Sequence, residues 1–266
     1  MDSRGAEMAG GLSTGASLVG SLLIAVTLAF LHLLAPRIRR LPGVPERATS
    51  SFAGGVAVAY VFLHLLPELS EGNQAIGEAL GDRLEATPLL DLAVFAVALA
   101  GFAAFYGLER LARRGESGGA EAAAPVFYLH LAAFFVYNAL ITYTMPLRLR
   151  TGIAFALLFS VAMALHFVLT DRGLVEHYPR RFTHRGRFLL ALALLVGWVA
   201  VALFAPVSTL LVSLLTALLG GSILLNVFKE ELPSERESSF GWFASGLALY
   251  AALLALTTAF SEGSGA

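Results

Sequence analysis

Seven stretches of the chain contain no Asp, Glu, Lys or Arg, and each is at least 17 residues long. None of them alternates between apolar and polar positions as the strands of a membrane barrel do. A helix needs about 20 apolar residues to cross a hydrocarbon core of about 30 Å. The stretches therefore predict membrane-spanning helices, and they cover residues 8–36, 48–67, 92–108, 122–147, 151–170, 188–228 and 238–261.

The stretch 188–228 is too long for one span, because its 41 residues would form a helix of about 61 Å. Pro206 lies near its middle, where a proline ends one helix and allows the next to begin. We therefore expect two spans here, and eight in an all-α, polytopic membrane protein. The eight spans form one membrane domain, residues 1–266, and are expected near residues 16–35, 49–67, 88–108, 125–146, 151–171, 187–205, 207–229 and 239–260.

Basic residues mark one side of the predicted bundle. Short loops rich in Lys and Arg stay in the cytoplasm, and 14 of the 18 basic residues follow the first, third, fifth and seventh spans. Both termini are therefore expected outside the cytoplasm, in a multi-pass protein of the inner (plasma) membrane. His177 and His184 fall in the arginine-rich loop after the fifth span, which we interpret as an orientation signal and a contact with anionic lipid.

A linker of small residues, GESGGAEAAA at 115–124, divides the domain. It separates a first three-helix unit (1–114) from two central helices (125–171), and a last three-helix unit (187–266) follows.

The composition narrows the class of protein. Hydrophobic residues make up 57% of the chain and charged residues 14%, against about 25% charged in a soluble domain. The net charge of -1 offers no basic surplus for nucleic acid, so the lipid bilayer is the expected partner. The absence of cysteine excludes disulfides and thiolate metal sites. An intramembrane zinc hydrolase is disfavoured because no His-Glu-x-x-His motif is present, and we expect no enzyme.

An internal repeat links the second and seventh spans. Residues 54–67, GGVAVAYVFLHLLP, align without a gap with residues 220–233, GGSILLNVFKEELP, and six of the 14 positions are identical. By the arginine count the second span runs outward and the seventh inward. We therefore expect an inverted repeat that relates spans 1–3 to spans 6–8; the alternative is a chance match in a biased composition.

Both segments resemble helices of the Zrt- and Irt-like (ZIP) family of divalent-metal transporters. Residues 52–56 (FAGGV) and 62–68 (FLHLLPE) are similar to the second helix of that family, and residues 220–233 are similar to its seventh. Eight spans, outside termini and a cytoplasmic linker after the third span agree with the same plan. The resemblance implies a ZIP-like fold and a homodimer.

The resemblance also implies a metal site, which the family builds from His-Asn-x-x-Asp/Glu-Gly in the fourth span and His-Glu-x-x-His in the fifth. The fourth span here reads FFVYNALITY at 134–143, so Tyr137 replaces the histidine, Asn138 is kept and Ile141 replaces the acid. The fifth reads HFVLTD at 166–171, where His166 is kept and Asp171 lies one residue beyond the second histidine. The sequence departs from the family pattern at most of the ligand positions.

Ionisable side chains inside spans are costly and therefore predict function. From the rise per residue of a helix, His32, His130 and His166 are expected within about 10 Å of the cytoplasmic face. The carboxylates of Asp171 and Glu230 are expected at a similar depth. Imidazole and carboxylate together suit Zn²⁺ or a similar ion, so this layer predicts a metal or proton site. The alternative is that each histidine is hydrogen-bonded separately. The predicted metal ligands are His166, Asn138, His130, Asp171 and Glu230.

A path across the membrane is predicted from further polar side chains. His64 and Glu68 lie four residues apart, at the outer end of the second span, and form either an entry site or a helix end. Lys229 beside Glu230 would compete with a metal ion or replace it as a fixed counter-charge. The predicted pathway residues are His64, Glu68, Tyr137, His32 and Asn226.

These features predict a ZIP-like transporter of a divalent, zinc-like cation, in which one helix bundle rocks against another. Zn²⁺ or another divalent metal would be the substrate, and no cofactor is required. The alternative is a ZIP-like scaffold that has lost ordinary metal transport and serves a structural, regulatory or other-cation role.

Overall fold

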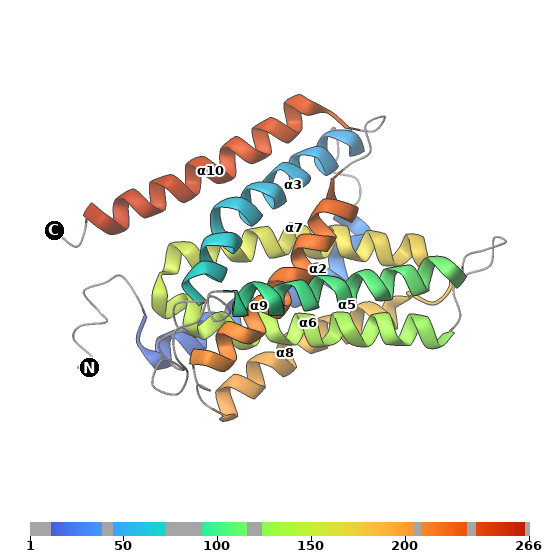
Figure 1. Ribbon diagram of the computed structural model, residues 1–266, viewed down its shortest axis with the longest axis horizontal. Coiled ribbons are helices and arrows are strands. Elements are labelled where there is room, and N and C mark those ends of the chain that lie inside the picture. The colour runs from blue at the N-terminus through green and yellow to red at the C-terminus, as the bar shows by residue number, and fades with distance from the viewer. Residues whose placement is uncertain are drawn as a thin grey trace.

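The protein is a bundle of long helices in a computed structural model (Figure 1) that describes residues 12–38, 45–72, 92–115, 124–204, 209–232 and 238–263. No strand occurs in these ranges. Seven helices are long and apolar enough to cross a membrane, and an eighth apolar segment, Ser213–Lys229, is shorter. The helices and their apolar character confirm the expectation of an all-helical, multi-pass membrane protein.

The helices follow the predicted spans closely. The division of the stretch 188–228 is confirmed, because one helix ends at Phe204 and the next begins at Thr209. The elements are α2 (Thr14–Ile38), α3 (Glu46–Tyr60), the π-helical segment η1 (Val61–Leu65), α5 (Ala93–Gly115), α6 (Ala124–Thr151), α7 (Ile153–His177), α8 (His184–Phe204), α9 (Thr209–Asn226), the π-helical segment η2 (Val227–Glu231) and α10 (Phe240–Gly263).

Four helices extend well beyond their predicted ends. The helix that contains α3 and η1 continues to Gly72, α5 to Gly115, α6 to Thr151 and α7 to His177. The predictions ended where charged residues begin. Arg148 lies inside α6 because its charge is paired within the bundle, so the helix does not end at the charge. His177 is the last residue of α7 and does not belong to a loop.

Each of the two π-helical segments is followed closely by a proline in the sequence. In η1 the N–H of Leu66 donates to the carbonyl of Val61, and in η2 the N–H of Leu232 donates to the carbonyl of Val227 at 3.2 Å. A proline is the next residue in each case, Pro67 and Pro233. A proline ring crowds the carbonyl four residues before it, and a wider turn relieves that crowding.

Helices that follow one another in the chain alternate in direction, whereas the partners in each of the most extensive pairs run parallel (Figure 1). The segments α3 and α9 run in opposite directions, and α2 begins at the same end of the bundle at which α10 ends. The most extensive helix pairs are α3 with α10, α5 with α9, and α6 with α8. Side chains also bond across the pairs: Thr142 Oγ1 donates to the Leu194 carbonyl at 2.7 Å, and Trp198 Nε1 donates to the Leu18 carbonyl at 3.0 Å.

Glycines allow pairs of helices to approach each other closely. A Cβ at Gly55 in α3 would overlap the Phe243 carbonyl oxygen of α10. A Cβ at Gly221 in α9 would overlap the Ala98 carbonyl oxygen of α5. In lipid, small residues let two backbones approach and gain dispersion energy.

The same two interfaces contain a second pair of glycines on the opposite helix. A Cβ at Gly246 in α10 would overlap the Phe52 carbonyl oxygen of α3. A Cβ at Gly101 in α5 would overlap the Leu218 carbonyl oxygen of α9. In each interface, one glycine from each helix therefore lies at the point of closest approach between the two backbones.

Candidate functional site

The first polar cluster joins α2, α6, α7 and α8 in the bundle interior. His32 Nδ1 donates to Asp171 Oδ1 at 3.0 Å, and His32 Nε2 accepts from Asn138 Nδ2 at 2.9 Å. Asn138 Nδ2 also donates to the Leu190 carbonyl at 3.2 Å. His32, Asp171 and Asn138 are each at most 2% exposed. Because every proton has an acceptor, this geometry describes a neutral His32 with its proton on Nδ1.

An arginine completes this cluster. Arg187, near the start of α8, has its Nε 3.5 Å from Asp171 Oδ2, and its side chain is only 12% exposed. The His32 ring also stacks on Phe167, with ring centroids 4.5 Å apart. The carboxylate of Asp171 therefore already has a cationic neighbour and a histidine donor.

The second cluster lies between α6 and α7. His166 Nε2 is 3.0 Å from the Tyr137 hydroxyl and 3.3 Å from Thr170 Oγ1. His166 and Tyr137 are both buried. Tyr137 therefore binds, inside the bundle, the histidine that the ZIP resemblance places in a metal site.

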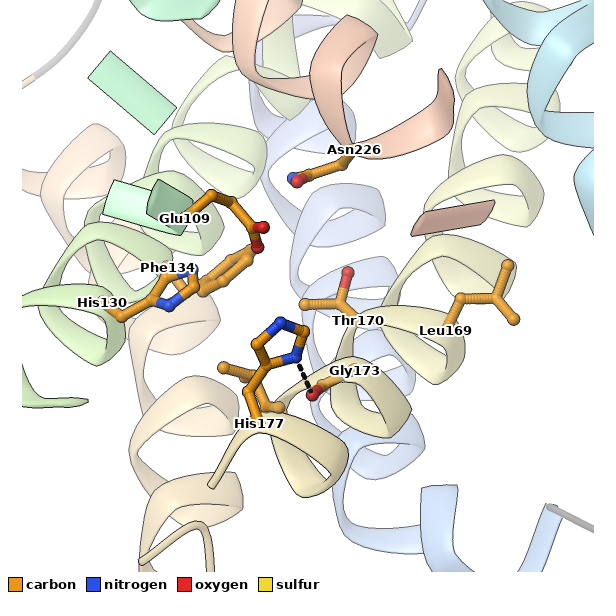
Figure 2. Close-up of a pocket in the computed structure, with 9 residues that line it drawn as sticks. Glu109, His130, Phe134, Leu169, Thr170, Gly173, His177 and Asn226 are labelled. Atoms are coloured by element: carbon orange, nitrogen blue, oxygen red, sulfur yellow. Dashed lines mark hydrogen bonds between the residues drawn. The ribbon is translucent and has the colours of Figure 1, made fainter. Parts of the chain in front are cut away.

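The third cluster surrounds a cavity of about 30 Å³ between α5, α6, α7 and α9. His130 lies against it, with Nδ1 3.1 Å from the Tyr178 hydroxyl and its ring stacked on Phe134 at 5.0 Å. Figure 2 shows Glu109, His130, His177 and Asn226 arranged around this space. His130 Nε2 and Asn226 Nδ2 are buried there without a hydrogen-bond partner.

An ion pair closes one side of this third cluster. The Lys229 ammonium in η2 pairs with the Glu109 carboxylate in α5, and Glu109 is 5% exposed. The pair joins two helices that already pack closely, α5 and the helix that contains α9 and η2. The charge of Lys229 is therefore paired with a carboxylate of the bundle.

A fourth cluster lies toward the opposite end of the bundle. Arg148 in α6 pairs with Glu68 at 2.7 Å, and its guanidinium lies 4.0 Å from the centroid of the Phe159 ring. The ring of Tyr60 lies 5.4 Å from that of His64 and 6.4 Å from that of Tyr250. Glu68 is therefore paired with a cation of the chain.

The predicted metal ligands do not converge. His166 bonds with Tyr137, His130 with Tyr178, and His32 with Asp171, in three separate clusters. Among the residues that the structure describes, no group of three or more His, Asp or Glu side chains is placed to hold a metal ion. The side chain of Glu230 lies outside the described part of the chain.

Sequence reasoning missed the partners of these groups. Glu109, Arg148 and Arg187 each adjoin the end of a charge-free stretch; the two arginines were counted as loop charges, and Glu109 was not considered. A charge directly beside such a stretch is a usable signal, because one helical turn brings it into the bundle. Tyr178 carried no signal, since its contact with His130 depends on how α7 ends.

The sequence matches no protein-family model, and no curated protein is significantly similar to it.

Proposed function

We propose that the chain is an inverted repeat, in which α2, α3 and α5 are related to α8, α9 and α10 by a twofold axis in the membrane plane. The alignment of residues 54–67 with 220–233 makes η1 equivalent to η2, residue for residue. Opposite directions of α3 and α9 in Figure 1 support the inversion. Inverted repeats of this kind are typical of secondary transporters.

Reciprocal contacts are the strongest support for this axis. A twofold axis requires that if one residue contacts a second, their equivalents contact each other. Gly55 and Gly221 are equivalent in the alignment, and the same offset, continued two residues before it, relates Phe52 to Leu218. Gly55 and Phe52 meet α10, while Gly221 and Leu218 meet α5, each in the same way.

A residue on such an axis contacts its own equivalent. Phe62 and Phe228 occupy the same place in the alignment, and their rings meet edge to face with centroids 6.2 Å apart. This contact is expected of an axis that passes between η1 and η2. It is not required of two unrelated helices.

The function we propose is membrane transport of a small cation, on a plan like that of ZIP transporters. The observation that carries it is the pairing of a half-buried and a buried carboxylate with cations of the chain toward the two ends of the bundle. Glu68 pairs with Arg148 toward one end, and Asp171 with Arg187 toward the other. Charges are placed inside membrane bundles at a cost, and they commonly mark ion pathways.

A transport assay tests this proposal. Purified protein in proteoliposomes is expected to take up radioactive zinc or manganese above empty vesicles, and His166→Ala is expected to reduce the rate by about tenfold or more. The matched control is Val161→Ala, a change on the outer surface of the same helix, where Val161 is 53% exposed. Absence of uptake for each of zinc, manganese and iron by well-folded protein would defeat the transporter proposal.

A second candidate is a scaffold that no longer moves divalent metals and has a structural, regulatory or other-cation role. It is favoured by the separation of His166, His130 and His32 into three hydrogen-bonded clusters. This candidate predicts folded protein without metal uptake, so the same assay distinguishes the two.

A further inference from the structure

We propose that the cavity of the third cluster is a binding site for a first-row divalent cation of the zinc type, which Lys229 holds closed as a competing internal cation. The residues that carry the site are Glu109, His130 and His177, with Asn226 beside them. The site differs from the one that the ZIP resemblance implies, because His166 and Asn138 do not line it. Its role in transport rests on the proposed function, whereas its chemistry does not.

Each imidazole has its Nδ1 held by a hydrogen bond. Nδ1 of His177 lies 2.9 Å from the Gly173 carbonyl, which accepts only, so Nδ1 carries the proton and Nε2 keeps its lone pair. Nδ1 of His130 lies 3.1 Å from the Tyr178 hydroxyl, and its Nε2 is buried without a hydrogen-bond partner. Histidines that bind metal almost always have their second nitrogen fixed by such a bond.

Two oxygen-bearing groups complete the donor set. Glu109 brings a carboxylate to the cavity, and Asn226 brings an amide group, whose oxygen is the atom that can bind a cation. Two imidazole nitrogens and one carboxylate oxygen are ligands that Zn²⁺ accepts, and a water molecule can take a fourth position. The cavity of about 30 Å³ has room for an ion with such a water, because a water needs about 10–15 Å³ measured in this way.

Lys229 explains why these ligands are not assembled around a common point. Its ammonium pairs with the Glu109 carboxylate, which is the only negative charge among the described residues that line the cavity. A cation in the cavity would repel the ammonium, and the two would compete for one carboxylate. Release of Lys229 would free Glu109 to turn toward the two histidines.

The test measures Co²⁺ binding to purified protein in detergent, because Co²⁺ in a tetrahedral nitrogen and oxygen site absorbs visible light. Replacing Lys229 with methionine is expected to tighten Co²⁺ binding by on the order of tenfold or more, as for other coupled occupants of one site. Lys229→Arg keeps the charge and is expected to bind as weakly as the wild type. Adding His177→Gln to Lys229→Met is expected to abolish the gain.

The control is His184→Gln in the Lys229→Met background, since His184 is exposed at the start of α8 and outside the cavity. It is expected to leave Co²⁺ binding unchanged. If Lys229→Met does not fold alone, Co²⁺ is expected to restore its thermal midpoint while Lys229→Met/His177→Gln is not restored. The proposal would be overturned if wild type and Lys229→Met bound Co²⁺ with equal affinity. It would also be overturned if adding His177→Gln left the Co²⁺ affinity of Lys229→Met unchanged. These readouts need no transport, so a failed uptake assay leaves them intact.

Discussion

Replacing Arg148 with methionine is expected to lower the free energy of unfolding by about 3–5 kcal/mol, because it leaves the Glu68 carboxylate without its partner inside the bundle. The side chain of Arg148 is 11% exposed and that of Glu68 is 27% exposed, so water replaces little of the lost interaction. The guanidinium also loses its contact with the Phe159 ring. Unfolding of purified protein in detergent, followed by tryptophan fluorescence against denaturant, measures the change.

The double variant Glu68→Leu/Arg148→Met provides the decisive comparison. Removing both charges is expected to restore stability to within about 1 kcal/mol of the wild type, since apolar groups often replace a buried pair without loss. Arg150→Met is the matched control, because Arg150 is exposed on the same helix. If the double variant is no more stable than Arg148→Met alone, the loss is not due to an unpaired charge.

Replacing Asp171 with alanine is expected to cost about 3–5 kcal/mol as well, because the change breaks a buried pair from one side. His32 loses the acceptor for Nδ1, and Arg187 loses its carboxylate. Asp171→Asn is expected to cost less, since its amide oxygen still accepts from His32. The same unfolding measurement applies.

An exposed pair on the same helix serves as the reference for Asp171. Glu176 bonds with Arg172 at 2.9 Å but is 59% exposed, and Glu176→Ala is expected to change stability by at most about 0.5 kcal/mol. Equal losses for Asp171→Ala and Glu176→Ala would mean that the buried cluster contributes no more than a surface ion pair.

The helices were predictable from the sequence, and their ends were not. Lipid excludes unpaired charge, so stretches without charge identify the spans, and Pro206 correctly divided the longest one. The same reasoning ended α6 and α7 too early. It treated Arg148 and His177 as loop residues, although partners inside the protein allow a charged or polar residue to extend a span.

The polar clusters were predictable only in part. Single residues such as His32, His166 and Asp171 were identified because they are polar within apolar stretches. Their partners were not, because a hydrogen bond such as that between His32 and Asn138 depends on how distant helices pack. The depth of the histidines along their spans predicted a single layer. Their side chains point in different directions around the helix axes, so they belong to separate clusters.

The meeting of equivalent residues at one axis is the central claim, and cysteine cross-linking tests it in the native membrane. The chain contains no cysteine, so Phe62→Cys/Phe228→Cys carries the only two thiols. A short bifunctional thiol reagent is applied, and a protease then cuts at a site inserted in the linker between α5 and α6. We expect the two halves to remain joined without reductant, and to separate in each single variant and in Phe62→Cys/Leu203→Cys. Separation of the halves in folded Phe62→Cys/Phe228→Cys would contradict the proposed axis.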